Sequence, residues 1–202
     1  MSYSRDEKST LLSIALDSIN CGLHHGKPAR LNTADYSPTL AAQRASFVTL
    51  KHGATLRGCI GTLDARASLV ESIADNAYAA AFNDPRFPPT GASELEDLTI
   101  GISVLSPLEE VAVTSEQDLL DQLIPGEAGW VLQDTGNRGT FLPSVWTSLS
   151  VPADFLRQLK IKAGLAPDHW SNTLQIWRYR TDSFAAAVAD IASSGRDRST
   201  AG

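Results

Sequence analysis

Two apolar runs at residues 46–51 and 55–63 constrain the fold more than any other feature of the sequence. They are separated by a glycine turn at residues 53–54, and strand-like runs joined in this way are typical of a β-hairpin. In a regular hairpin with that turn, Cys59 lies opposite Val48. The first half of the chain is therefore expected to build an antiparallel sheet around this pair of strands.

The order strand, strand, helix, strand occurs twice along the chain. After the first hairpin, apolar residues at helical spacing predict a helix over residues 69–81, and the run 98–105 predicts a strand. The second set is predicted at residues 129–134, 138–142, 151–164 and 174–180. We therefore predict an α+β fold of two lobes, each built on an antiparallel sheet from one strand-strand-helix-strand unit.

The two hairpins carry a similar arginine-glycine pair. Arg57 and Gly58 in the first hairpin correspond to Arg138 and Gly139 in the second. An internal duplication would explain the match and would relate Arg57 to Arg138 by a pseudo-twofold operation. Two such pairs can also coincide by chance, so the sequence leaves both explanations open.

The two ends of the chain are expected to differ in order. Ser4 and Glu7 form a capping-box pattern that predicts a helix continuing to Gly22. The tail at residues 193–202 has no apolar residue larger than alanine, and we expect it to be disordered.

Residues 1–192 are expected to form a single domain, with lobes at about 1–107 and 108–192 and a short helix near the start of the second lobe. The 202 residues suffice to bury a core without disulfides or metals. Only Cys21 and Cys59 are present and the N-terminus lacks a signal-peptide pattern, so we expect a reducing, cytoplasmic environment. A net charge of −6 argues against non-specific nucleic-acid binding, and no apolar run approaches the ~20 residues that a membrane span needs.

The sequence LRGCIGTL at residues 56–63 contains the strongest chemical signal. Gly58 and Gly61 weaken a strand, so they indicate that another backbone or a ligand comes close. Strict alternation along a strand places Arg57 and Cys59 on one face. A fixed positive charge beside a cysteine favours the thiolate, so this strand is a candidate reactive or anion-binding site.

The chain has four histidines, and none has an obvious place beside Cys59. In the predicted hairpin His52 lies about four residues from Cys59, roughly 13 Å at about 3.3 Å per residue. His169 precedes the last predicted strand and could reach Cys59 only through tertiary folding. A free cysteine is also commonly a small buried hydrophobic residue, so a reactive role and a structural or ligand-lining role both stay open.

Asp84, Arg86 and Phe87 form a second candidate group directly after the first predicted helix. In one interpretation, Asp84 and Arg86 clamp this loop onto another strand while Phe87 anchors it. In the other, Arg86 joins Arg57 and Arg138 in binding a carboxylate or phosphate, with Asp84 as orienter or proton carrier.

No metal or cofactor motif is found in the sequence. His24 and His25 have no third or fourth ligand spaced nearby, and no P-loop or GxGxxG sequence follows a predicted strand. The CxxxCxxC cluster of a radical SAM enzyme is also missing. We therefore predict no metal site and no cofactor.

Several longer runs resemble the AMMECR domain family, which is called AmmeMemoRadiSam system protein A in bacteria and archaea. They are FVTLKHGATLRGCIGTL (47–63), NAYAAAFNDPRFPP (76–89), ISVLSP (102–107), RGTFLPSVW (138–146) and FLRQLKIKAGLAPDHW (155–170). The resemblance implies a two-lobed α+β fold in which the RGCIG strand lines a cleft between the lobes. It also implies genomic association with a Memo-like protein and a radical SAM enzyme.

Two hypotheses about function follow. In the first, the protein is an enzyme acting on a small or RNA-borne anionic substrate, with Arg57 and Arg86 binding the anion, Cys59 as nucleophile or thiol acid/base and Asp84 as orienter. In the second, it is a non-catalytic partner that binds or presents a substrate to the Memo-like and radical SAM proteins. The arginine and thiol on one strand favour the first.

Overall fold

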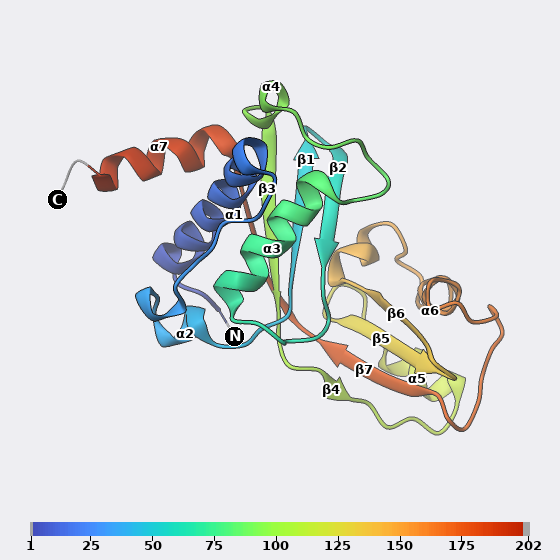
Figure 1. Ribbon diagram of the computed structural model, residues 1–202. Helices are drawn as coiled ribbons and strands as arrows, with labels where there is room; N and C mark the ends of the chain where they lie inside the picture. The colour runs from blue at the N-terminus through green and yellow to red at the C-terminus, as the bar shows by residue number, and fades with distance from the viewer. Residues whose placement is uncertain (1, 200–202) are drawn as a thin grey trace. The chain divides into compact units, whose positions relative to one another are not determined.

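The computed structural model describes residues 2–199 and combines helices with antiparallel sheets, as predicted (Figure 1). The chain forms two compact units. Unit 1 comprises the chain up to Leu105 and from Asp182 onward, and unit 2 comprises Ser106–Thr181. Within the described residues, no helix is both long and apolar enough to cross a membrane. The elements are α1 (Arg5–His25), η1 (Thr33–Asp35), α2 (Pro38–Ala41), β1 (Ser46–His52), β2 (Thr55–Gly61), α3 (Leu69–Phe82), α4 (Ala92–Leu95), β3 (Leu98–Leu105), β4 (Glu109–Glu110), α5 (Glu116–Gln122), β5 (Gly129–Asp134), β6 (Asn137–Phe141), η2 (Pro143–Thr147), α6 (Pro152–Lys162), β7 (Gln175–Tyr179), β8 (Thr181–Ala187) and α7 (Val188–Ser199).

Helix α1 begins at the predicted capping box. The Ser4 hydroxyl accepts a hydrogen bond from the backbone N–H of Glu7, whose carboxylate accepts one from the N–H of Ser4. The sequence led us to expect that the helix ends at Gly22, but it continues to His25. Gly26, with a left-handed φ of 67°, caps its C-terminus. Gly22 is needed instead for packing, because a Cβ there would lie 2.2 Å from the ring of Phe82.

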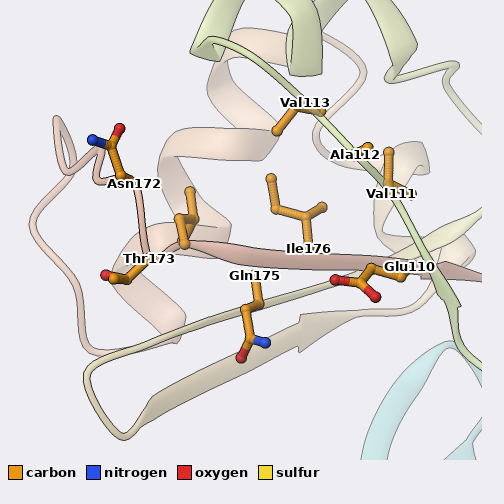
Figure 2. A pocket seen from close by; sticks show the side chains of 9 residues that line it. Glu110, Val111, Ala112, Val113, Asn172, Thr173, Gln175 and Ile176 are labelled. Atoms are coloured by element: carbon orange, nitrogen blue, oxygen red, sulfur yellow. The ribbon is translucent and has the colours of Figure 1, made fainter.

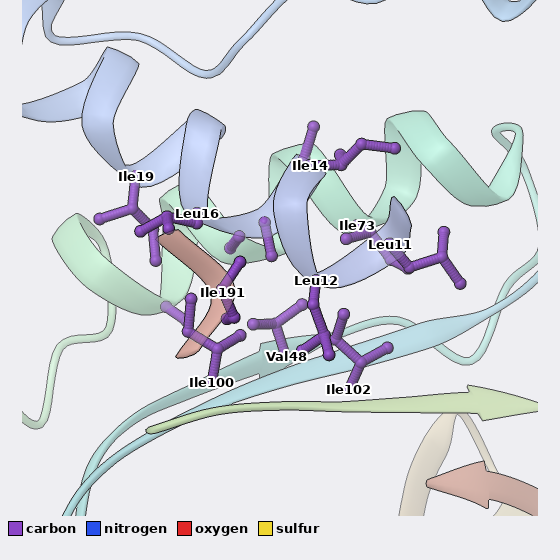
Figure 3. Packing of buried hydrophobic residues seen from close by; sticks show 14 of the residues in the cluster. Leu11, Leu12, Ile14, Leu16, Ile19, Val48, Ile73, Ile100, Ile102 and Ile191 are labelled. Atoms are coloured by element: carbon purple, nitrogen blue, oxygen red, sulfur yellow. The ribbon is translucent and has the colours of Figure 1, made fainter. Parts of the chain in front are cut away.

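Unit 1 is built on a four-stranded sheet in the order β2-β1-β3-β8. Helix α3 packs against β1 and β2, and α1 packs against α3 and β3. Figure 3 shows the resulting apolar core, in which Leu12 of α1 lies beside Val48 of β1 and Ile102 of β3, and Leu11 lies beside Ile73 of α3. Burying these side chains supplies the main driving force for this unit.

The last part of the chain belongs to unit 1, whereas the sequence placed residues 108–192 together in the second lobe. The Asp182 carboxylate accepts hydrogen bonds from the Tyr3 N–H at 2.7 Å and from Lys8 Nζ at 2.7 Å, which ties the start of β8 to that of α1. Helix α7 follows and buries Ile191 in the core. It runs to Ser199 and so includes the first residues of the tail expected to be disordered, whereas residues 200–202 lie outside the described part of the chain.

Unit 2 is built on a second antiparallel sheet in the order β4-β7-β5-β6. Helix α6 lies within the predicted range 151–164, begins with Pro152 in its first turn and packs against β6. In the core of this unit the rings of Trp146 and Phe155 are stacked with centroids 3.7 Å apart.

The predicted strand-strand-helix-strand repeat is confirmed. In unit 1 the hairpin β1–β2 is followed by α3 and then β3, which pairs with β1; in unit 2 the hairpin β5–β6 is followed by α6 and then β7, which pairs with β5. The matching glycines both make room for the backbone of the following helical segment. A Cβ on Gly58 would lie 2.1 Å from the Ala80 carbonyl oxygen of α3, and one on Gly139 would lie 2.6 Å from the backbone of Ala163, directly after α6. In both units the helix therefore approaches the second hairpin strand too closely for any side chain.

The register of the first hairpin differs from the prediction. Cys59 lies opposite Thr49, not Val48, because the register shifts between Leu50 and Lys51. In the resulting ladder Arg57 has no counterpart on β1, so it is the extra residue of a β-bulge. Strict alternation therefore cannot be carried from Cys59 through Arg57.

Replacing either close-contact glycine by alanine should destabilise its own unit. We expect Gly58→Ala and Gly139→Ala each to lower the free energy of unfolding by about 1–3 kcal/mol, because helix and strand must move apart. Urea unfolding can be followed by far-UV circular dichroism for the whole chain and by tryptophan fluorescence for unit 2, which contains all four tryptophans.

Gly101→Ala in β3 is the matched control. Its new Cβ would meet nothing closer than 3.7 Å, so the change should be neutral or stabilising by up to about 1 kcal/mol. Equal destabilisation by all three substitutions would contradict the close-approach explanation.

Candidate functional site

Cys59 lies on β2, the edge strand of the unit 1 sheet, with both of its backbone groups directed away from β1. The Cys59 N–H donates to Asp84 Oδ2 at 2.9 Å, and the Cys59 carbonyl accepts from Arg86 Nη2 at 3.1 Å. Because both backbone groups of Cys59 point away from β1, Cys59 and the opposite residue Thr49 form a non-hydrogen-bonded antiparallel pair. In such a pair the two side chains lie close together. The Asp84–Arg86 pair thus occupies the position of a further strand at this edge.

Asp84 is fully engaged in holding this arrangement. Its side chain is only 2% exposed, and its oxygens also accept from the backbone N–H, Nε and Nη2 of Arg86. The Arg86 hydrogen bonds, together with that from the Cys59 N–H, hold the pKa of Asp84 well below its ordinary value. An ionised carboxylate with every oxygen occupied is suited to orienting its neighbours and not to carrying protons.

Among the described residues, the thiol of Cys59 has a hydroxyl donor but no base as a hydrogen-bond partner. The Thr49 hydroxyl donates to Cys59 Sγ at 3.3 Å, and this is the one side-chain hydrogen bond of Cys59 with a described residue. Arg86 is 53% exposed, and its pKa is raised, chiefly by the hydrogen bonds to Asp84 and also by the charge of Cys59. The site therefore combines a half-buried sulfur, a hydroxyl donor and a solvent-accessible cation.

Arg57 is occupied by a partner that the sequence did not suggest. Its Nε donates to Glu94 Oε2 at 3.0 Å and its Nη2 to Glu94 Oε1 at 2.7 Å. The pKa of Glu94 is lowered, chiefly by these hydrogen bonds. The ring of Phe87 lies near both cations, 6.0 Å from Cζ of Arg57 and 5.4 Å from that of Arg86. Asp84 and Arg86 thus bind the backbone of Cys59, whereas Arg57 is paired with Glu94 and shares only the ring of Phe87 with Arg86.

The two glycines of the strand have structural explanations. Gly58 makes room for α3, as described above, and a Cβ on Gly61 would lie 2.3 Å from the ring of Phe47 on β1. The predicted close approach at both positions is therefore made by the protein itself.

Arg138 and His169 belong to unit 2, where Arg138 lies opposite Gln133 in the β5–β6 ladder. His169 Nε2 lies 2.6 Å from Oδ2 of Asp134, at the end of β5. The hydroxyls of Ser171 and Thr173 also donate to Asp134, at 2.5 Å and 2.7 Å. These hydrogen bonds, that of Ser171 foremost, lower the pKa of Asp134 to about 2. His169 thus anchors the loop before β7.

A large hollow in unit 2 contains none of the predicted site residues. Figure 2 shows this space, of about 530 Å³, between the segment from Glu110 to Val113 and the segment from Asn172 to Ile176. Its lining has one charged side chain, Glu110, and Thr173 is the only member that also contacts Asp134. Among the described residues, no group of three or more His, Cys, Asp or Glu side chains is placed to hold a metal ion.

A family model described as AMMECR1 matches residues 12–184. The chain belongs to the AMMECR1 family. A relative in Methanothermobacter thermautotrophicus is 36% identical over 183 residues, covering 90% of this chain and 95% of the relative. A relative in Sulfolobus acidocaldarius is 38% identical over 169 residues, covering 80% and 73%. Both AMMECR1-type proteins therefore match over most of their length.

The AMMECR1 fold is also found in a solved structure. The crystal structure of the uncharacterized protein PH0010 from Pyrococcus horikoshii superposes with a TM-score of 0.81 at 29% sequence identity, covering 88% of this chain and 90% of that one. The architecture described above is therefore shared with that solved protein.

Replacing Asp84 should destabilise unit 1 and change its response to acid. We expect Asp84→Asn to cost about 1–3 kcal/mol at neutral pH, because the Cys59 N–H and Arg86 lose a charged acceptor. Because the pKa of Asp84 is lower in the folded state than in the unfolded chain, its ionised form stabilises the fold at pH values above the ordinary pKa of 3.8. This stabilisation is lost as the pH falls below 3.8. Urea midpoints at about pH 7 and about pH 3 should therefore differ less in Asp84→Asn than in the wild type.

Asp97→Asn is the control for this comparison, since Asp97 is an exposed carboxylate of the same unit. If Asp84→Asn and Asp97→Asn behaved alike at both pH values, the engaged role of Asp84 would be wrong.

Asp134 should have the corresponding effect in unit 2. Its pKa of about 2 means that its contribution to stability is complete above the ordinary value of 3.8 and disappears as the pH falls toward 2. We expect Asp134→Asn to lower the urea midpoint at neutral pH, measured by tryptophan fluorescence. Between pH 3.8 and about pH 2 the midpoint should fall less in Asp134→Asn than in the wild type. An unchanged midpoint would show that the loop carrying His169 does not depend on this carboxylate.

Proposed function

We propose that this AMMECR1-family protein is a thiol-dependent enzyme that binds an anionic small-molecule or RNA-borne substrate around Arg57 and Cys59. The observation that carries the proposal is the placement of Arg86. It is held by Asp84 and by the Cys59 carbonyl, yet it remains 53% exposed beside the thiol. A cation fixed next to a cysteine favours the thiolate, which is the nucleophilic form.

The simplest reaction for this site is addition of the thiolate to a carbonyl carbon. A sulfur lone pair forms the S–C bond, and the π pair of the C=O bond moves onto oxygen as the negative charge develops there. The attacking species is the thiolate, so no base has to remove a proton in the addition step. The Arg86 guanidinium is a charged donor that can stabilise the oxyanion, and the Thr49 hydroxyl supports the thiolate before attack.

Asp84 and Arg57 take different parts in this proposal. Asp84 is a positioning residue, because it fixes Arg86 and the backbone of Cys59. Arg57 lies two residues before Cys59 and is the second site for an anionic group of the substrate. Arg138 belongs to unit 2 and has no part in the site proposed on β2 of unit 1.

A non-catalytic role is the alternative, and two observations favour it. Among the described residues no base contacts Cys59 Sγ, and Glu94 occupies the hydrogen-bonding face of Arg57. In that case the protein binds or presents a substrate for others. With an identified substrate, Cys59→Ser would abolish turnover but keep binding if the protein is an enzyme, and would leave function intact if it is a binding partner.

In either role we propose a Memo-like protein and a radical SAM enzyme as the partners. The resemblance of the LRGCIG and DPRF segments to AmmeMemoRadiSam system protein A motivates this assignment.

The proposed thiol activation can be measured without a substrate. We expect iodoacetamide to modify Cys59 of the native protein at neutral pH at least about tenfold faster than Cys21, read by peptide mass spectrometry. Both cysteines have intermediate exposure, so accessibility alone does not predict this difference. Arg86→Gln should slow the modification of Cys59 severalfold.

Arg66→Gln provides the matched control. Arg66 pairs with Asp64 at 2.9 Å across the same two-residue spacing as Arg86 with Asp84, but it lies on the surface away from the thiol's hydrogen bonds. The proposal of an activated thiol would be wrong if Cys59 were modified no faster than Cys21. It would also be wrong if Arg86→Gln and Arg66→Gln changed the rate at Cys59 equally.

A further inference from the structure

We infer that Glu94 is an exchangeable internal ligand of Arg57, and that the substrate is a small carboxylic acid whose carboxylate takes the place of Glu94. The inference rests on the proposed function and names its substrate class. It also makes the Arg57–Glu94 contact an autoinhibitory one, since the site cannot receive its ligand while Glu94 is bound.

The geometry of the pair is that of a bound carboxylate ligand. The two oxygens of Glu94 accept parallel hydrogen bonds from Nε and Nη2 of Arg57, at 3.0 Å and 2.7 Å. This two-point contact matches planar carboxylates and gives arginine its selectivity for them. The Arg57 side chain is 13% exposed and that of Glu94 is 32% exposed, so the carboxylate lies on the solvent side of the guanidinium.

Few other contacts hold Glu94 in this position. It lies in α4, a helix of four residues in which Leu95 alone is buried. Besides Arg57, the carboxylate of Glu94 accepts a hydrogen bond from the backbone N–H of Gly91 at 2.8 Å. Glu94 can therefore leave Arg57 by a side-chain rotation while Leu95 keeps α4 in place, and its carboxylate then becomes solvated.

Glu94 also leaves part of Arg57 unused. Nη1 of Arg57 is buried and has no hydrogen-bond partner among the described residues. The hydroxyl of Thr90, close to Glu94 in the chain, is likewise buried without one. Buried polar groups without partners are costly, so a ligand with an additional acceptor can gain hydrogen bonds that Glu94 does not make.

The position of Arg57 limits the size of the ligand. Arg57 and Arg86 both lie near the ring of Phe87, with Cζ 6.0 Å and 5.4 Å from its centroid, and Arg86 also donates to the Cys59 carbonyl. A carboxylate on Arg57 therefore places the reacting carbonyl carbon only a few bonds away if that carbon is to meet the Cys59 sulfur. The substrate class that fits is a short carboxylic acid with a second electrophilic or anionic group.

The test compares succinate binding to the wild type and to Glu94→Gln by isothermal titration calorimetry. Glutamine keeps an acceptor for the Gly91 N–H but cannot neutralise Arg57. We expect Glu94→Gln to bind succinate at least about tenfold more tightly than the wild type, because the internal competitor is removed. Succinate should also raise the melting temperature of Glu94→Gln more than that of the wild type.

Three further variants make the result specific. Glu96→Gln, an exposed glutamate directly after α4, should match the wild type. Glu94→Asp, in which the carboxylate is one methylene shorter, should change affinity in the same direction as Glu94→Gln. Adding Arg57→Gln to Glu94→Gln should remove the gain, with folding of each variant verified by its melting temperature.

Equal succinate affinity in the wild type and Glu94→Gln would overturn the inference, as would binding that persists without Arg57. Preference for inorganic phosphate over succinate would overturn the carboxylate class. The result is independent of thiol chemistry, because Cys59→Ser in the Glu94→Gln background should bind succinate unchanged. An unreactive Cys59 would then refute the proposed function while leaving the carboxylate site in place.

Discussion

The contact on which the candidate site depends is the one between the Asp84–Arg86 pair and the backbone of Cys59. An edge strand leaves alternate N–H and C=O groups without a strand partner, and such groups invite pairing with another chain. Here a carboxylate accepts from the N–H and a guanidinium donates to the C=O of one residue. The edge is closed without another strand, and a positive charge is fixed beside a thiol by the same interaction.

The surrounding fold explains why this contact forms where it does. Helix α3 lies so close to β2 that Gly58 has no room for a Cβ, and the chain leaves α3 at Asn83 and turns directly along the strand edge. Asp84 is therefore delivered to Cys59 by the end of the helix that packs on the same strand. The second unit repeats the close helix at Gly139, but its hairpin keeps a regular register at Arg138 and its buried aspartate, Asp134, holds a loop instead.

Local patterns in the sequence predicted the elements that local interactions determine. The capping box at Ser4, the two hairpins and helix α3 depend on residues that are near one another in the chain, and they were predicted. The bulge at Arg57 was missed because alternation assumes a regular ladder, and nothing in the residues themselves marks the irregularity. The return of β8 to unit 1 was missed for a related reason, since its link to α1 through Asp182 spans most of the chain.

The sequence grouped the candidate residues by spacing but did not show how they are connected. Grouping Arg57 with Cys59 and Asp84 with Arg86 required only spacing, and the clamp of the loop onto another strand was one of the two interpretations. Glu94 gave no signal, because α4 is four residues long and too short for a helical pattern. Thr49 could have been found only from the shifted register, which places it opposite Cys59.

Amide hydrogen exchange at Cys59, resolved by NMR, tests the central interaction most directly. If the Asp84 carboxylate replaces a neighbouring strand, the Cys59 N–H should exchange slowly in the wild type and much faster in Asp84→Asn. The amide of Val48, in the buried strand β1, should be unaffected and serves as the internal reference. Unchanged protection at Cys59 in the variant would contradict the account, because the strand edge would then be protected by something other than Asp84.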